Sequence, residues 1–235
     1  MSAQFPPMNN SHSSTAPVIA IDGPGGSGKG TVSMRLAQEL GWHFLDSGAL
    51  YRIVAVAAMD RKIASDAGPS LDELAQQLDV KFGFSDEGMV ILLDGNRITD
   101  RLRSEEVSAF ASEVATIAAV RAALVGLQRA FRKPPGLVAD GRDMGTVIFP
   151  DAILKIFLTA SVDARADRRY KQLKEKGESV NLSRLFRDIE KRDARDSSRS
   201  VSPLKPAADA HIIDSTEMSI DMVLDKVYSL LKKFK

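Results

Sequence analysis

The sequence predicts an α/β fold built on a parallel β-sheet with helices on both faces. Short apolar segments, typical of strands buried on both faces of such a sheet, alternate for the most part with segments of helical periodicity. The first apolar segment runs into a glycine-rich turn that opens a helix. The five predicted strands are residues 18–22 (VIAID), 43–46 (HFLD), 137–140 (LVAD), 154–159 (LKIFLT) and 211–214 (HIID). Doubly wound sheets bind ligands beyond the carboxyl ends of their strands, where the glycine turn lies.

Composition narrows the class of protein. At 235 residues, with 44% hydrophobic and 27% charged residues, the chain is expected to form one globular domain with insertions. The absence of cysteine excludes disulfides and thiolate metal sites, and three histidines argue against a histidine zinc cluster. A net charge of +1 gives no global field for nucleic acid. Neither a secretory signal nor an apolar run near the roughly 20 residues of a membrane span is seen. We expect a cytoplasmic monomer with no nucleic-acid or membrane partner.

The domain is expected to cover residues 17–235, after a disordered leader over 1–16 that is rich in Ser, Asn and Pro. Residues 62–103 read as a small α+β insertion in a core of 17–61 and 104–235. Within it, Ser70–Glu73 resembles a capping box that opens a helix. Three short strands are predicted next, over residues 80–84, 89–93 and 97–99, joined by turns at 85–88 and 94–96.

Helices are predicted over the remaining connections. Residues 31–40 have helical periodicity and end at Gly41, a plausible C-cap. Residues 104–133 read as two helices that stop at Pro134-Pro135-Gly136, and residues 161–200 as two charged helices broken around Gly177. Residues 161–205 hold 13 Lys and Arg against 8 Asp and Glu, so the near-neutral chain contains a basic segment.

The glycine turn, GPGGSGKGT, contains the G-x-x-x-x-G-K core of a phosphate-binding P-loop. Its glycines allow backbone N–H groups to point at a phosphate, the helix N-terminus adds partial positive charge, and Lys29 can bridge the β- and γ-phosphates. The same turn without a ligand is the structural alternative, which the lysine at this spacing disfavours. The predicted ATP-phosphate site comprises Gly23, Pro24, Gly25, Gly26, Ser27, Gly28, Lys29, Gly30 and Thr31.

One departure concerns the metal. The usual P-loop places Ser or Thr directly after the lysine to hold Mg²⁺, whereas here Gly30 intervenes before Thr31. The GKGT ending resembles nucleoside-monophosphate kinases of the adenylate kinase type, in which Mg²⁺ is held largely through water and phosphate oxygens. We therefore expect Mg²⁺ to accompany ATP without a dense protein cage, and assign no protein ligand to it.

Three further segments carry charge near predicted strand ends. In DSGALYR, Ser47 can cap a helix and Arg52 can reach an anion, although a capped helix with a surface arginine explains this segment equally well. In DGRDMGT, Arg142 and Asp143 follow a strand, where charged residues are costly unless paired or bound, so a functional role is favoured over a structural ion pair. The third segment, RDARDSSR over residues 192–199, reads by itself as a solvated charged helix.

Together, GPGGSGKGT, LDSGALYR, ADGRDMGTVIFPDA, KRDARDSSR and SPLKPAADA resemble the bacterial cytidylate kinase family, over essentially the whole chain after residue 16. The resemblance implies a five-stranded parallel core, an enlarged acceptor-binding region and a mobile lid at about 163–177. It implies transfer of a phosphoryl group from ATP to CMP, and to dCMP, in pyrimidine metabolism.

The resemblance also implies roles at matching positions. Ser47 and Arg52 would contact the CMP phosphate, Ser112, Arg121 and Asp143 would face cytosine, and Asp196 would accept from the ribose hydroxyls. The residues expected to act on the phosphates are Lys29, Arg142, Arg192 and Arg199. Tyr51 is included among the substrate-binding residues, while the motifs leave open which of the lid residues Arg165, Arg168 and Arg169 enter the site.

Two rival functions stay open on sequence grounds. Another small P-loop kinase, acting on UMP, AMP or a non-nucleotide alcohol, would have the same phosphate loop. A nucleotide-dependent switch would also bind ATP or GTP, but the chain has no NKxD guanine motif and carries more arginines than a hydrolytic switch needs.

Overall fold

The computed structural model describes residues 16–85, 88–175, 177 and 179–234, so residues 1–15 of the expected leader lie outside the described residues. Ala16 is buried, and its carbonyl oxygen accepts a hydrogen bond from Nε of Arg132 over 2.7 Å. The chain divides into two compact units. One comprises Ser47–Ala130, and the other contains the described residues of 16–46 and 131–234.

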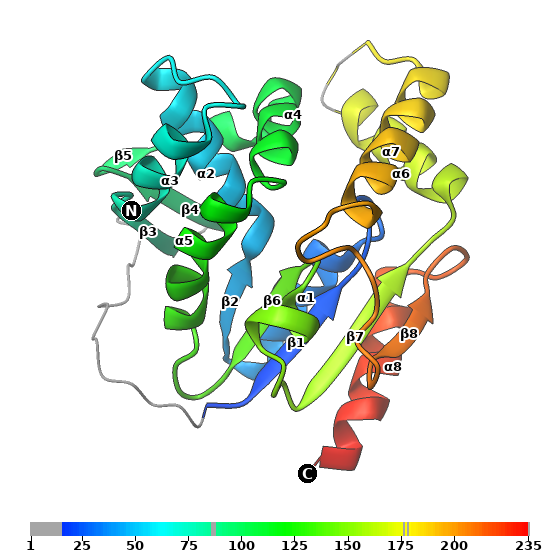
Figure 1. Cartoon of the computed structure of the whole chain (residues 1–235). Coiled ribbons are helices and arrows are strands. Elements are labelled where there is room, and N and C mark those ends of the chain that lie inside the picture. Colours follow the sequence, from blue (N-terminus) through cyan, green and yellow to red (C-terminus); the bar gives the residue numbers. More distant parts are fainter. Residues whose placement is uncertain (1–15, 86–87, 176, 178, 235) are drawn as a thin grey trace. The chain divides into compact units, whose positions relative to one another are not determined.

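The second unit is built on a five-stranded parallel sheet in the order β2-β6-β1-β7-β8 (Figure 1). The strands are β1 (Val18–Asp22), β2 (His43–Asp46), β6 (Leu137–Gly141), β7 (Leu154–Thr159) and β8 (His211–Asp214). All five predicted strands and the α/β fold class are thus confirmed. The central strand β1 and its neighbour β6 are buried at every position, as expected for strands covered on both faces.

Helices α1 (Lys29–Leu40) and α8 (Ile220–Leu231) pack against each other and share the main apolar core with the sheet. Val32 and Leu36 of α1 and Val223 and Val227 of α8 belong to this core, at the spacings of one helix face. Helix α1 ends at Gly41, whose φ of 65° suits glycine and confirms the predicted C-cap. Helices α6 (Val162–Glu175) and α7 (Leu182–Ser197) form the predicted charged pair.

Within its described residues, the first unit combines four helices, a short 3₁₀ turn η1 (Arg101–Arg103) and a three-stranded antiparallel sheet. The helices α2 (Ser47–Asp60) and α3 (Gly68–Gln76) pack against α4 (Glu105–Val114) and α5 (Ala118–Ala130), respectively. The sheet consists of β3 (Val80–Ser85), β4 (Gly88–Leu93) and β5 (Asn96–Arg97). Most of α2 is buried, so this helix forms the centre of the unit.

Three local predictions about the first unit need correction. Helix α3 begins at Gly68 after Ala67, so Ser70 lies within it and does not cap it. Pro69 explains the earlier start, because proline has its φ preset for a helix and lacks an N–H that the first turn would leave unbonded. Strand β5 ends at Arg97, and Ser47 is the first residue of α2 rather than the residue before it.

The turns of this sheet are partly described. Asp94 and Gly95 have φ values of 49° and 80°, which match the tight hairpin turn predicted between β4 and β5. The turn predicted at 85–88 includes residues 86–87, which lie outside the described residues.

Among the described residues, no single helix is long and apolar enough to cross a membrane. The α4–α5 region passes such a test only as a pair bent by 99°.

Candidate active site

The glycine loop joins the central strand β1 to α1 at the carboxyl edge of the parallel sheet. Two of its glycines are required by geometry. A Cβ at Gly23 would lie 2.0 Å from the carbonyl oxygen of Leu158, and Gly28, just before α1, has a φ of 91°. Glycine is therefore required at the start of the loop and directly before α1, where the open N–H groups of the helix lie.

Lys29 is the first residue of α1 and is buried inside this loop. Its Nζ donates to the carbonyl oxygen of Pro24 over 3.1 Å and lies 3.9 Å from Oδ1 of Asp140. Burial, followed by the charge of nearby Arg142, lowers the pKa of Lys29 to about 8. A buried ammonium group with a lowered pKa is suited to binding a phosphate, which replaces the hydration that the lysine has lost.

Asp140 explains the unusual glycine after the lysine. A Cβ at Gly30 would lie 3.2 Å from Oδ2 of Asp140, a distance that few real contacts reach. The space that Ser or Thr fills in the common motif is therefore bordered by a carboxylate. Burial raises the pKa of Asp140 to about 7, against the opposing effect of the positive Lys29.

Two arginines from distant parts of the second unit meet over the glycine loop. A Cβ at Gly25 would lie 3.6 Å from Nη2 of Arg142 and 3.6 Å from Nη1 of Arg192. Arg142 follows β6, whereas Arg192 lies on α7. The structure thus brings Lys29, Arg142 and Arg192 together around one loop, as a site for several phosphate charges requires.

Asp196 forms ion pairs with Arg142 and with a further arginine, Arg199. One carboxylate oxygen accepts from Nε of Arg142 over 2.8 Å, and the other is bonded to Arg199, which lies just beyond the end of α7. The Asp196 side chain is only 2% exposed. Burial alone would raise its pKa, but Arg142 and Arg199 outweigh burial and hold the pKa of Asp196 below its usual value.

Asp143 lies at the start of a helical turn, η2 (Met144–Ile148), directly after Arg142. Its side chain is buried but does not cap this turn. The turn has the wide hydrogen-bond pattern of a π-helix, with the N–H of Ile148 donating to the carbonyl oxygen of Asp143 over 3.2 Å. Such wide turns are frequent at functional sites.

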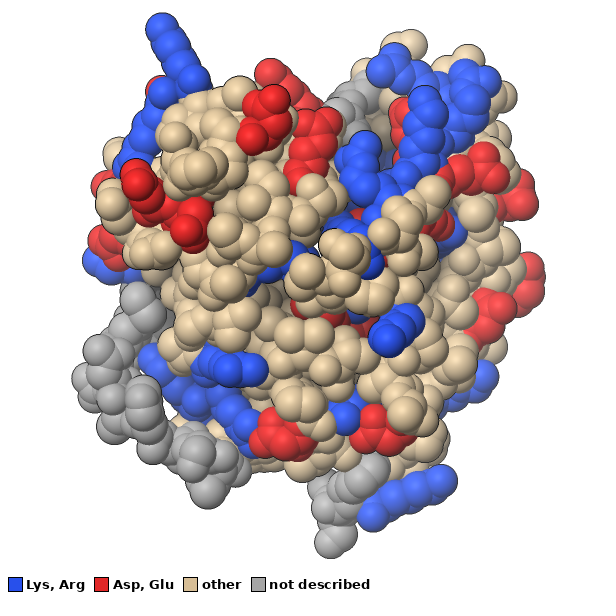
Figure 2. All heavy atoms as spheres, viewed as in Figure 1, with Lys and Arg blue, Asp and Glu red and all other residues tan. Residues whose placement is uncertain are grey.

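Basic side chains lie over the region of α6 and α7 in the view of Figure 2. Arg165 donates to the carbonyl oxygen of Gly25 over 3.1 Å and forms a two-pronged ion pair with Asp193 of α7, at 2.5 and 3.0 Å. Arg168 donates to backbone oxygens of Ser215 and Thr216, in the segment after β8. Arg165 and Arg168 therefore hydrogen-bond to backbone oxygens, in the glycine loop and after β8, respectively. Arg169 lies half-buried on α6.

The remaining predicted residues belong to the first unit, on α2, α4 and α5. The guanidinium of Arg121 lies 5.6 Å from the centre of the Tyr51 ring, within the range of a cation–π contact. Ser112 is buried, and its Oγ has no hydrogen-bond partner within the part of the chain that the structure describes. Ser47 is buried and Arg52 half-buried on α2. An orphaned buried hydroxyl is costly, so Ser112 is suited to a polar ligand atom.

Sequence reasoning missed two buried carboxylates in the second unit. Asp140 ends the LVAD segment beside the phosphate-loop strand, and the available signal for it was an apolar strand segment that ends in aspartate. Asp22 ends β1 directly before the loop, but its partners Met144 and Gly145 lie more than 120 residues away, so no local pattern could identify them.

A glycine loop between a central parallel strand and a helix, with a buried lysine and two arginines around it, defines a P-loop nucleotide-binding enzyme. The model of the cytidylate kinase family matches residues 19–233. The chain belongs to the cytidylate kinase family, and it is a kinase that phosphorylates a nucleoside monophosphate.

Curated relatives align with this chain over nearly their full lengths. A cytidylate kinase from Stutzerimonas stutzeri is 57% identical over 215 residues, covering 91% of this chain and 94% of the relative. One from Pseudomonas fluorescens is 58% identical over 216 residues, with the same coverage of 91% and 94%. One from Bordetella bronchiseptica is 55% identical over 212 residues, covering 90% and 93%. These values confirm the resemblance found in the sequence motifs.

Proposed function

We propose that this enzyme transfers the γ-phosphoryl group of ATP to CMP, and to dCMP, by direct in-line displacement with Mg²⁺. The main observation in support is that the guanidinium groups of Arg142 and Arg192 both lie next to Gly25 of the loop that contains the buried Lys29. The glycine loop and Lys29 are sufficient to bind the phosphates of one nucleotide. The two further arginines therefore favour a second anion bound near the first. Cytoplasmic residence, a monomeric state and a role in pyrimidine metabolism belong to the same proposal.

The chemistry needs positioning and charge neutralisation rather than a general base. A CMP phosphate oxygen is largely ionised near neutral pH, and the transition state spreads negative charge over the equatorial oxygens. Lys29 would follow the migrating group from the loop side. Arg142, Arg192 and Arg199 would offset repulsion between the two nucleotides and hold the attacking and leaving oxygens in line.

The residues present fit a magnesium ion at the end of the loop. Burial raises the pKa of the Asp140 carboxyl to about 7, so a further cation beside it would favour its ionised form. In the described part of the chain no three His, Cys, Asp or Glu side chains gather as a metal-binding group. Mg²⁺ needs no such cage, because one or two carboxylates and the substrate phosphates hold it.

Asp140 would hold this ion, directly or through water. When bound, Mg²⁺ neutralises charge on the phosphate oxygens. Arg165 and Arg168 would act differently, by keeping the segments around the glycine loop in place while α6 serves as part of a lid that excludes water.

For the acceptor, we propose that Ser47 and Arg52 bind its phosphate and Asp196 binds its ribose. Ser112, Arg121 and Asp143 would read cytosine, with Tyr51 supporting Arg121 through the ring contact. Cytosine presents an amino donor at N4 and acceptors at N3 and O2. A carboxylate and a guanidinium match this pattern, whereas uracil would present an acceptor to the carboxylate.

Phosphate transfer from ATP labelled at the γ-position tests the proposal. Incubated with Mg²⁺ and CMP or dCMP, the enzyme should move the label to CDP or dCDP at matching rates of ADP formation. Label released as inorganic phosphate would indicate hydrolysis, and a labelled product only with AMP or UMP would overturn the acceptor assignment. Omission of Mg²⁺ should abolish transfer, and activity that is unaffected by chelator would contradict the metal role.

A further inference from the structure

Asp22 links the phosphate loop to the segment that carries Arg142 and Asp143. It is the last residue of β1, directly before Gly23, and its side chain is buried. Oδ1 accepts from the N–H of Met144 and Oδ2 accepts from the N–H of Gly145, both over 2.8 Å. One carboxylate on the loop strand therefore binds two successive N–H groups of the turn that follows β6.

These two N–H groups are the open donors at the start of η2. An aspartate at the position before a helix usually accepts such donors itself, and Asp143 occupies that position. Its side chain makes no such capping bond. Because Asp22 supplies the cap from a neighbouring strand, the conformation of Asp143 does not have to satisfy its own helical turn.

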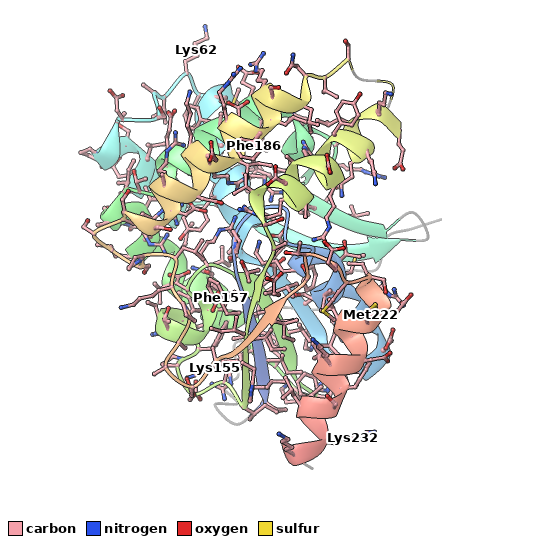
Figure 3. All side chains as sticks on the ribbon, turned by 90° about the vertical axis from the view of Figure 1, so that its right-hand side faces the viewer. Lys62, Lys155, Phe157, Phe186, Met222 and Lys232 are labelled. Carbon is pink, nitrogen blue, oxygen red and sulfur yellow. The ribbon has the colours of Figure 1, made fainter. Side chains whose placement is uncertain are left out.

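The turn is also packed from a second side. A Cβ at Gly145 would lie 3.2 Å from Cγ and Cδ of Lys155 and 3.4 Å from Oδ2 of Asp22. Lys155 projects from β7, where Figure 3 labels it, and its Nζ donates to Oδ1 of Asp209 over 3.0 Å. Gly145 is thus enclosed by the carboxylate and the lysine stem, which leaves the turn little room to shift.

This arrangement has a cost in stability. Burial raises the pKa of Asp22 to about 6 in spite of its two backbone hydrogen bonds. The charge of Asp143 raises the pKa of Asp22 further and that of Lys29 lowers it. The charge of Asp22 in turn raises the pKa of Asp140 on β6. A buried carboxylate beside proposed functional residues is more typical of a functional site than of a stabilising contact.

We propose that Asp22 is a positioning residue for acceptor recognition, which fixes the turn carrying Arg142 and Asp143 to the strand that ends in the phosphate loop. The inference rests on the proposed role of Asp143 in reading the base. It assigns Asp22 no contact with substrate. Its effect should therefore appear in selectivity between acceptors, and hardly in the affinity for ATP.

The isosteric substitution Asp22→Asn tests this role. The amide oxygen can accept only one of the two N–H groups, and the amide NH₂ faces the other donor. We expect kcat/KM for CMP to fall about tenfold, the CMP-to-UMP ratio of kcat/KM to fall with it, and the Kd for ATP, measured by calorimetry without acceptor, to change less than about twofold. Cooperative thermal unfolding should be retained.

Gly145→Ala disturbs the same turn without removing a charge, and Gly126→Ala on α5 is its matched control, because a Cβ at Gly126 meets nothing within 4 Å. Gly145→Ala should lower the CMP-to-UMP ratio, whereas Gly126→Ala should leave it unchanged. An unchanged ratio in both Asp22→Asn and Gly145→Ala would overturn the positioning role, as would an equal loss of ATP affinity. A wild-type enzyme with no preference for CMP would instead contradict the proposed function, on which this role depends.

Discussion

Arg142 donates its Nε–H to Oδ2 of Asp196 over 2.8 Å, so a proposed phosphate-binding group and the proposed ribose-binding group are bonded to each other. Arg199 is bonded to the other oxygen of the same carboxylate. An ionised Asp196 thereby orients two cations, one that follows β6 and one that follows α7. A ribose hydroxyl that donates to this carboxylate would be held beside both of them.

Asp196→Asn should raise the KM for CMP by about tenfold or more, because a hydrogen bond to a charged group is worth roughly 1.5–3 kcal/mol. The KM for ATP should stay within about twofold. Steady-state kinetics with each substrate varied in turn, compared with Asp221→Asn at an exposed pair with Arg35, gives the measurement and its control. Equal weakening of both substrates would make Asp196 a structural partner of the arginines only.

Lys29→Ala should fold and lose nearly all phosphoryl transfer. The substitution removes the charge that follows the migrating group, while the apolar core, to which Lys29 does not belong, is left intact. Coupled ADP release and thermal unfolding measure the two quantities. Lys226→Ala, at an exposed position on α8, serves as the control. A folded Lys29→Ala protein with near wild-type turnover would remove Lys29 from the reaction.

The stability difference between Asp22→Asn and the wild type should depend on pH. The pKa of Asp22 is raised from 3.8 to about 6, so the folded state keeps a proton that the unfolded chain has released. The associated stability is fully present below about pH 4 and is lost as the pH rises through 6. Asparagine does not titrate. The variant should therefore gain Tm relative to the wild type between pH 4.5 and 7.5, and a difference independent of pH would show that Asp22 is not held as a buried acid.

The sheet was predictable from sequence because each strand is a local apolar run, and the loop because its glycines and lysine are adjacent. The residues that cap the helices were harder to predict from sequence. Ser70 matched a capping box, but Pro69 at the start of α3 decided where the helix begins. Two local patterns thus predicted different start points for the same helix, and the sequence alone does not show which of them determines the boundary.

The contacts around the site depend on register and helix packing, which no local pattern contains. Asp22 pairs in register with Gly141, and this alignment brings its carboxylate to Met144 and Gly145. Likewise, the sequence left open which lid arginines enter the site, since the pairing of Arg165 with Asp193 arises only when α6 packs on α7.

Asp143→Asn should reduce the preference for CMP over UMP, mainly by lowering CMP turnover. An amide can rotate to donate toward O4 of uracil, whereas the carboxylate would place two acceptors against each other. The ratio of kcat/KM for the two acceptors, measured at saturating ATP, is the readout. An unchanged ratio would leave base reading to Ser112 and Arg121.

The most direct measurement is kcat/KM of the wild-type enzyme for CMP, dCMP, UMP and AMP, each with ATP and Mg²⁺ at one pH. A buried mismatch leaves polar groups unpaired, so CMP should exceed UMP by at least about a hundredfold, with dCMP also phosphorylated. Comparable values for CMP and UMP, or a preference for AMP, would contradict the proposed assignment of this site to cytosine.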